Sequence, residues 1–211
     1  MAAEVDIANL ALGRIGHTEA LSSLTDQNKA GRNAARLYPM VRDRALQISQ
    51  PQWAQQIVPL AVSTASIPGW GYVYDYPSDC LHLVAVCDAA GARFWSQPTS
   101  WRERQQIKLP AQPYQLFDSG SDSTVIGTDV EGAYGVMTMR VTKTTRYPPM
   151  FISGLGWLLA SELGAALEAD AKLIQNALGM ADRELAMAAA LTANESIEDE
   201  PPDSPSVRIR G

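Results

Sequence analysis

Apolar residues recur at helical spacing at both ends of the chain, and the last such stretch, residues 151–191, is the longest. It is rich in Ala and Leu and contains no proline. Recurrence at i, i+3 and i+4 predicts an amphipathic helix. At about 1.5 Å of rise per residue, one unbroken helix of this length would exceed the width of a small domain. We therefore expect the helix to break at Asp170, which is placed to cap a second helix. The predicted core-facing stripes are Leu155, Leu159, Leu163 and Ala166 on the first helix, and Leu173, Ala177, Met180, Met187 and Leu191 on the second.

The opening of the chain has the same helical period. Residues 3–15 predict a first helix that Gly16 ends. Asp26 is placed to cap a second helix, in which Pro39 introduces a kink or divides the segment into two shorter helices. Trp53 follows this helix as a core anchor. The apolar positions of the two helices are Val5, Ala8, Leu12, Ile15, Ala30, Ala34, Leu37, Val41, Ala45 and Ile48.

From residue 57 to residue 142 the apolar period becomes that of β-strands, which predicts a small antiparallel sheet with long loops. Ala90 and Gly91 predict a hairpin turn into a short strand at 93–95. The segment 147–149, Tyr-Pro-Pro, returns the chain to helix, because proline suits the first turn of a helix. The other predicted strands cover 57–62, 72–76, 81–87, 114–117, 123–126 and 134–142.

The two helical ends each need a partner surface, and each offers the other the only comparable one. The predicted fold class is therefore α+β and mainly helical, with the N- and C-terminal helices packed as a bundle and a small antiparallel β subdomain with long loops inserted between them. We place the N-terminal helices at 1–56, the inserted β-rich subdomain at 57–147 and the C-terminal helices at 148–194. Residues 195–211 are acidic and rich in proline, which predicts a flexible tail.

Composition limits the classes of function. The 211 residues have a formal net charge of −6 and a pI near 4.9, which argues against a dedicated binder of DNA phosphates. Glu4 and Asp6 stand where a secretion signal would have a basic lead, so we expect no such signal. The most apolar run, 151–161, stops at Glu162 and is too short to cross a bilayer, so we expect no membrane partner.

The residues that could carry catalysis favour structural roles. Cys80 and Cys87 lie in an alternating strand pattern that holds them too far apart to bridge, so we expect reduced, buried thiols in a cytosolic protein. Asp79 precedes Cys80, and a neighbouring carboxylate raises the pKa of a thiol rather than activating it. His17 and His82 have no second ligand at metal-binding spacing. We therefore expect no catalytic residue, no metal and no cofactor.

Aromatic and basic residues alternate in one polar patch. It comprises Trp95, Trp101, Arg102 and Arg104. Such residues stack bases and pair phosphates in nucleic-acid sites, and they are equally enriched in the cores of protein interfaces. In an acidic protein built around paired helices, we favour a protein partner for this patch.

Three stretches of the chain resemble one family, in the family's order. The runs VDIANLALGRIG, LTDQNKAGRNAARLYPMVRDRALQ and QPQW look like the opening of the tail tubular protein A family, the head-to-tail adaptors of short-tailed bacteriophages. The run PGWGYVYDYPSDCLHLVAV is similar to the family's aromatic-rich segment, which ends in Pro-x-Asp-Cys-Leu, and YPPMFISGLGWLLASELG matches its return into Ala-rich helices. The family tends to follow its first tryptophan with Phe-Ala, whereas Ala54 and Gln55 follow Trp53 here. This departure affects the expected core packing more than the resemblance.

The resemblance implies a virion structural protein that is not an enzyme. Such adaptors pack their helices into a bundle and form a twelvefold ring beneath the portal protein, at the neck of a virion assembled in the host cytoplasm. Their C-terminal segments reach onto the portal, the β-rich insert meets the next tail (nozzle) protein, and genomic DNA passes through the channel without specific binding. On this chain the implied portal-binding tail is Pro201, Pro202, Pro205, Val207, Arg208, Ile209 and Arg210, and the implied contact with a tail component or a neighbouring subunit is Trp95, Trp101, Arg102 and Arg104.

Two other classes of function stay open. A small cytosolic hydrolase would use Cys80, Asp79 and a histidine, and rapid labelling of Cys80 at neutral pH would favour it. A nucleic-acid-binding module would use residues 95–104, and steeply salt-dependent DNA binding that is lost on Arg102→Ala and Arg104→Ala would support it. Neither alternative accounts for the paired helical ends and the tail.

Overall fold

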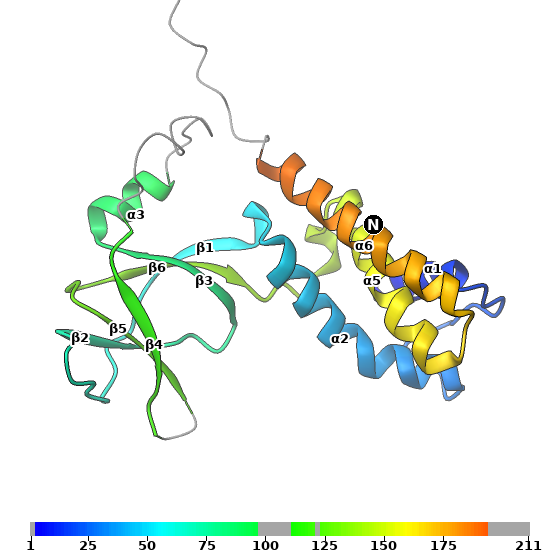
Figure 1. The fold of residues 1–211 in the computed structure, drawn as a ribbon, viewed down its shortest axis with the longest axis horizontal. Helices are drawn as coiled ribbons and strands as arrows, with labels where there is room; N and C mark the ends of the chain where they lie inside the picture. The colour runs from blue at the N-terminus through cyan, green and yellow to red at the C-terminus, as the bar shows by residue number, and fades with distance from the viewer. Residues whose placement is uncertain (1–2, 97–110, 121–122, 194–211) are drawn as a thin grey trace, which may run out of the picture.

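The structure is a computed structural model, and it describes residues 3–96, 111–120 and 123–193. Figure 1 shows a helical half and a β-rich half side by side along the long axis of the molecule. In the described residues, the helical half comprises α1 (Glu4–Arg14), α2 (Lys29–Ser49), α5 (Pro149–Leu167) and α6 (Ala171–Ala193). The β-rich half comprises six strands and α3 (Ala89–Ser96). The predicted fold class is confirmed.

Helix α5 forms the centre of the helical half. Both α1 and α2 contact α5, and α6 packs along it. Buried residues lie all around α5, as is typical of a helix enclosed by others. The first and last helices of the chain therefore pack together, as the sequence predicts. The largest fully buried side chains of their shared core are Ile7, Leu12, Tyr38, Leu46, Phe151, Leu155, Leu158, Leu159 and Leu163.

Helix α6 approaches α5 closely at two positions where α5 has no side chain. A Cβ atom on Gly154 would lie 2.8 Å from Leu185 Cδ2, and one on Gly164 would lie 2.8 Å from Ile174 Cγ1. Because both distances are well inside ordinary van der Waals contact, any larger residue would push the helices apart. The side chains that α6 buries here are mostly small ones, Ala177, Ala181 and Ala188.

The outward face of α6 differs from the prediction. Leu173, Met187 and Leu191 are 38%, 45% and 50% exposed, although their spacing predicts them in the core. Of the predicted stripe, Ala177 is buried and Met180 is half-buried. Ala177, Ala181 and Ala188 are buried instead, together with Leu185, which fits where Gly154 of α5 has no side chain. An apolar stripe therefore remains on the outside of α6.

The predicted helix ends are partly confirmed. Helix α1 stops before Gly16, whose φ of +79° suits a residue without a side chain. Asp170 caps α6 by accepting a 2.7 Å hydrogen bond from a backbone N–H of its first turn. Asp26 does not cap α2. Asn28 does, because its side chain accepts a 2.7 Å hydrogen bond from the N–H of Gly31.

Helix α2 runs without interruption through Pro39, so the predicted alternative of two shorter helices is wrong. Proline removes the N–H that would bond the carbonyl of Ala35. Pro39 and Ala35 are both exposed. Water can therefore hydrogen-bond that carbonyl, and the helix continues.

The β-rich half contains two antiparallel sheets where the sequence predicts one. The first has the strand order β1 (Gln55–Pro59), β6 (Tyr134–Met139) and β3 (Cys80–Cys87). The second has the order β2 (Tyr72–Asp75), β5 (Thr124–Thr128) and β4 (Tyr114–Asp118). Residues from both sheets form one core that is separate from the core of the bundle. It comprises Leu60, Tyr74, Cys80, Leu83, Val86, Ile126, Ala133 and Met137.

The segment after β3 is a helix, not the predicted hairpin turn and strand at 93–95. Helix α3 begins directly after Asp88, whose side chain accepts a 2.7 Å hydrogen bond from the N–H of Gly91. One capping side chain therefore outweighs the turn signal of Ala90 and Gly91. Trp95 at the far end of α3 packs on one face of the β1–β6–β3 sheet.

Helix α5 is longer than the apolar run that the sequence marks. It continues past Glu162, which forms a 2.9 Å ion pair with Arg44, and reaches nineteen residues. By length and composition alone, α5 is long and apolar enough to cross a membrane, which corrects the prediction that the run is too short. It is enclosed by three other helices, as the core helix of a bundle is.

Candidate functional site

Charged side chains join the helical half to the β-rich half. Asp43 of α2 lies 2.8 Å from Nε of Arg140 and 2.7 Å from Nη2 of Arg42. Arg140 follows β6 and also lies 3.1 Å from Asp79, which precedes β3. The hydrogen bond that Arg140 donates to Asp43 raises the pKa of its guanidinium. This joint fixes the β-rich half against α2, and no sequence pattern indicates it.

Aromatic rings form a second contact at the base of the bundle. Trp53 lies edge-on to Phe151, with ring centroids 5.1 Å apart, and its ring is 5.7 Å from that of Tyr147. Arg146 donates a 2.8 Å hydrogen bond to the carbonyl of Trp53. Burial raises the pKa of Tyr147 to about 12, and its hydroxyl donates a 2.6 Å hydrogen bond to the carbonyl of Val141. The prediction that Trp53 is a core anchor is confirmed.

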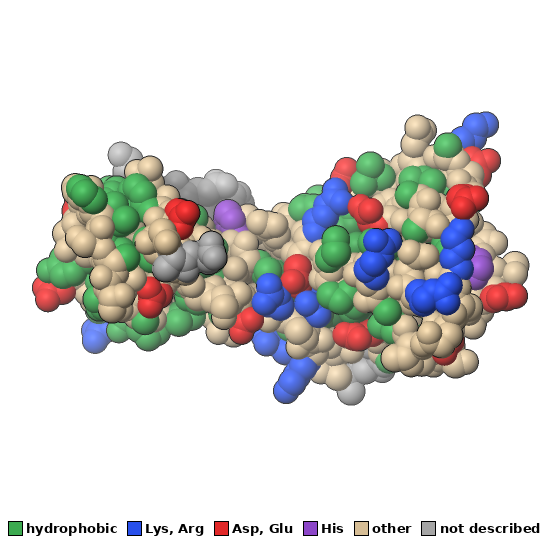
Figure 2. Space-filling view, turned by 90° about the horizontal axis from the view of Figure 1, so that it is seen from below, with side chains coloured by type: hydrophobic (Ala, Val, Ile, Leu, Met, Phe, Trp, Pro, Cys, Tyr) green, Lys and Arg blue, Asp and Glu red, His purple; other side chains and the backbone are tan. Residues whose placement is uncertain are grey.

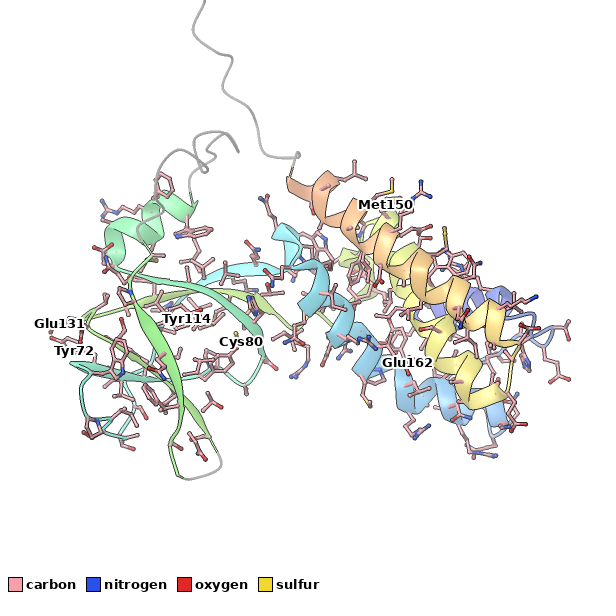
Figure 3. All side chains as sticks on the ribbon, in the orientation of Figure 1. Tyr72, Cys80, Tyr114, Glu131, Met150 and Glu162 are labelled. Carbon is pink, nitrogen blue, oxygen red and sulfur yellow. The ribbon has the colours of Figure 1, made fainter. Side chains whose placement is uncertain are left out.

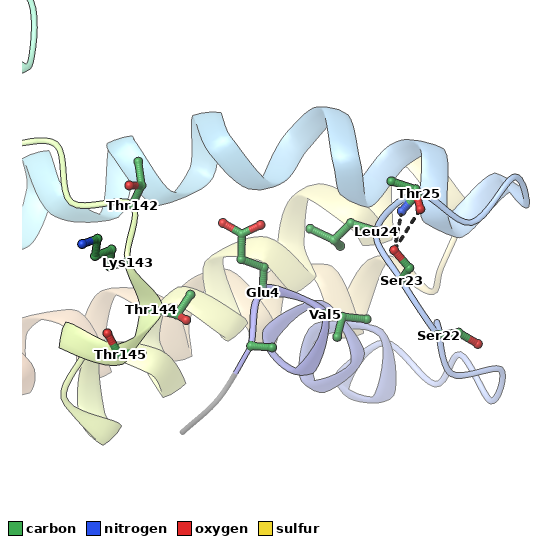
Figure 4. A pocket seen from close by; sticks show the side chains of 11 residues that line it. Glu4, Val5, Ser22, Ser23, Leu24, Thr25, Thr142, Lys143, Thr144 and Thr145 are labelled. Carbon is green, nitrogen blue, oxygen red and sulfur yellow. Dashed lines mark hydrogen bonds between the residues drawn. The ribbon is translucent and has the colours of Figure 1, made fainter.

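A groove of about 660 Å³ opens beside α1 (Figure 4). Its walls are the start of α1, the loop before α2 and the segment between β6 and α5, and its charged side chains are Glu4 and Lys143. The hydroxyls of Ser23 and Thr25 hydrogen-bond each other at 2.9 Å. The remaining polar side chains are hydroxyls, and none of the lining residues is a histidine or cysteine that could serve as base or activated nucleophile. Its lining is more apolar than polar, with Ala3, Val5 and Leu24 beside the hydroxyls.

A smaller cleft of about 340 Å³ lies beside the predicted aromatic patch. Trp95, Ile57 and Val136 supply its apolar lining, and three glutamines supply the polar rim. The indole N–H of Trp95 is buried and has no hydrogen-bond partner among the described residues. Trp101, Arg102 and Arg104 lie outside the described residues, so Trp95 is the only member of the patch that the structure places.

The two cysteines are free and buried, as predicted. Figure 3 places Cys80 in the β-rich half, away from Glu162 and the bundle. Its thiol donates a 3.1 Å hydrogen bond to the hydroxyl of Tyr76, and burial raises its pKa. Burial also raises the pKa of Cys87, to about 11. A nucleophilic cysteine requires the opposite shift, so this geometry does not favour the hydrolase alternative.

The described residues contain no cluster of three His, Cys, Asp or Glu side chains that could hold a metal ion. The Nε2 atom of His17 is buried without a hydrogen-bond partner in the same part of the chain. His82 lies within β3, opposite Thr138 of β6. The structure therefore brings neither histidine to a second ligand that it describes.

Helix α2 has a basic outer surface that the sequence analysis does not single out. Four of its basic residues, Lys29, Arg32, Arg36 and Arg44, are exposed, whereas the fifth, Arg42, is buried and pairs with Asp43, the one acidic residue of the helix. Figure 2 shows Lys and Arg side chains gathered over the helical half, while the other half shows few on this face. Lys29 forms a 3.0 Å ion pair with Glu168, and Arg44 pairs with Glu162. The exposed Arg36 donates a 3.2 Å hydrogen bond to the neutral side chain of Asn33. The local excess of positive charge was detectable from residue spacing alone.

Apolar side chains lie along the outer side of α6, three of them exposed and Met180 half-buried. We define the outer stripe of α6 as Leu173, Met180, Met187 and Leu191, whose spacing of seven, seven and four residues keeps them on one side of the helix. A second exposed apolar pair, Met40 and Ile48, lies on α2. Exposed apolar groups of this extent are typical of protein contacts.

The predicted portal-binding tail, Pro201 to Arg210, lies outside the described residues. No family model matches the chain, and no curated protein matches it.

Proposed function

We propose that the protein is a structural adaptor of a bacteriophage virion, which forms a ring under the portal, joins the capsid to the tail and surrounds the DNA channel. The observation that carries this proposal is the packing of the first and last helices of the chain around α5, which holds the β-rich half to one side. The segments that resemble tail tubular protein A build α1, α2, β2, β3 and α5, so the resemblance covers the frame of the fold.

In this proposal the outer stripe of α6 contacts the next copy in the ring. A ring of identical subunits needs two different surfaces that meet head to tail. The stripe is one such surface, and Met40 and Ile48 of α2 belong to a second, on a different helix. Burying four apolar side chains of this size contributes several kcal/mol per contact, at about 25 cal/mol per Å².

The proposal gives two parts of the chain different partners. Residues 201–210 bind the portal protein, and the β-rich half, with the patch that includes Trp95, meets the next tail protein. Genomic DNA passes through the channel without specific binding, because acidic groups that face it repel phosphates. The basic surface of α2 then faces away from the channel.

A mass measurement of the purified protein, alone and mixed with a candidate portal ring, tests the proposal. We expect a species of low mass alone and a ring of many copies on the portal. Met187→Lys, which places a charge in the stripe, should prevent the ring without unfolding the protein. Gln175→Lys is the matched control, since Gln175 is exposed on the same helix but outside the stripe. No assembly on any portal, or equal assembly of both variants, would overturn the proposal.

Deletion of residues 200–211 separates the portal contact from the fold. We expect this truncated chain to keep the helical content of the full chain and to lose portal binding. Unchanged portal binding would remove the tail from the proposal. A ring whose channel is lined mainly by Lys and Arg would remove the repulsion of DNA from it.

A further inference from the structure

Strand β1 forms one edge of its sheet. It pairs with β6 on one side, and in the described part of the chain no strand pairs with its other side. The N–H of Leu60 donates to the carbonyl of Ala133 at 2.9 Å, in continuation of this pairing. Backbone groups in an antiparallel pair alternate in direction, so Val58 directs its N–H and C=O toward β6 and Ile57 directs its own outward. The outer edge therefore offers the N–H and C=O of Ile57.

The sheet surface beside this edge is hollowed, with an apolar floor and a rim of glutamines. Ile57 and Val136 are directly paired across β1 and β6, and both line the 340 Å³ cleft with Trp95. The indole N–H of Trp95 is buried there without a partner among the described residues. A strand added along β1 would place every second side chain over this cleft.

The C-terminal end of α6 lies beside the same edge. Helix α6 contacts η1 (Gln52–Ala54), which leads directly into β1, and Gln52 lines the cleft. Figure 1 shows this end of α6 next to β1. Thirteen residues separate Ala193, the last residue of α6, from Val207. A chain of that length spans up to about 45 Å, so it can turn back to β1 without strain.

The segment that follows alternates in the way that an added strand requires. Ser206-Val207-Arg208-Ile209-Arg210 places Val207 and Ile209 on one face and the two arginines on the other. We propose that residues 206–210 of the same chain pair with the outer edge of β1 as a fourth strand, with Val207 and Ile209 over the cleft beside Trp95.

This pairing has a physical purpose in the unassembled protein. An open edge strand invites pairing with other chains, and natural sheets cover or interrupt such edges. A tethered segment meets its edge at an effective concentration in the millimolar range, so a short strand suffices. Pro59, the last residue of β1, has no N–H to donate to an added strand, so pairing along this edge stops there. The inference goes beyond the adaptor role, because it concerns the protein alone and needs no portal.

Amide hydrogen exchange measured by NMR on the full chain, without any partner, tests the proposal. The N–H of Ile57 reports the outer edge, and the N–H of Val58, which faces β6, is the internal reference. The test variant is Val207→Lys with Ile209→Lys, and the matched control is Arg208→Ser with Arg210→Ser. We expect exchange at Ile57 to become about tenfold faster in the test variant only, with Val58 unchanged.

Three results would overturn the proposal. Fast exchange at Ile57 in the natural sequence would show an uncovered edge. Slow exchange that persists in the lysine variant would assign the edge to another segment. Protection that rises with protein concentration would assign it to the tail of a second copy. None of these results bears on assembly with a portal, so the adaptor role stands or falls separately.

Discussion

Replacing Asp43 tests whether the charged joint holds the two halves together. Asp43 accepts from Arg42 and Arg140, and the Arg42 side chain is only 9% exposed. Asp43→Ala leaves that guanidinium without its carboxylate. Breaking a buried ion pair costs about 3 to 5 kcal/mol. Because Asp43 is 23% exposed and water can reach part of the site, we expect a loss of about 2 kcal/mol in the free energy of unfolding.

Asp79→Ala is the matched control, since Asp79 contacts the same Arg140 from a side chain that is 67% exposed. An exposed pair contributes about 0.5 kcal/mol, so the two variants should differ by about 1.5 kcal/mol. Urea unfolding followed by circular dichroism measures both values. Equal losses, or a loss below about 0.5 kcal/mol for Asp43→Ala, would refute the assignment of the joint to Asp43.

Three further predictions concern packing, helix continuity and a buried thiol. Gly154→Ala places a Cβ against Leu185 and should lower the free energy of unfolding by about 2 kcal/mol. Gly179→Ala is the control, because a Cβ there meets nothing within 4 Å, and it should raise the free energy of unfolding by up to about 1 kcal/mol. Equal effects in urea unfolding would contradict the close approach of α5 and α6. Pro39→Ala restores a backbone N–H on an exposed helix surface and should stabilise by about 1 to 3 kcal/mol, and a lower melting temperature would count against this explanation. Burial raises the pKa of Cys87 from 9.0 to about 11, so the unfolded chain releases this proton first and stability falls between those pH values, by about 2 kcal/mol. The natural sequence should therefore lose more stability than Cys87→Ala between pH 9 and pH 11, and parallel curves for the two would exclude the shift.

Features set by neighbouring residues could be predicted from the sequence. The break at Asp170 and the end of α1 before Gly16 depend on a capping side chain and on a glycine that lie in the same turn. The packing of the chain ends also followed, because each end had one apolar surface and no other partner. Trp53 was predictable as an anchor because its large apolar side chain also needs a buried partner surface. In the same way, a direct count of charges on α2 would have indicated its basic surface.

Features set by distant residues could not be predicted. Asp43 and Arg140 are 97 positions apart, and no pattern along the chain links them. The orientation of α6 depended on which of its apolar residues met α5: Leu185 fits against Gly154, and Ala177, Ala181 and Ala188 are buried with it. The division of the strands into two sheets depended on β6 inserting between β1 and β3, a pairing between segments about 50 to 80 residues apart. Of the predicted contact patch, the structure places Trp95 only.

The two proposals meet at the junction between the helical half and the β-rich half. The end of α6, the edge of β1 and the cleft beside Trp95 are adjacent there (Figure 1). If residues 206–210 cover the β1 edge in the free protein and bind the portal in the virion, then portal binding must first release them from β1. That release exposes the cleft beside Trp95 and the outer backbone edge of β1. Portal binding would then compete with the pairing of the tail to β1, so the affinity of the free protein for the portal would be reduced by the fraction of chains whose tail is paired.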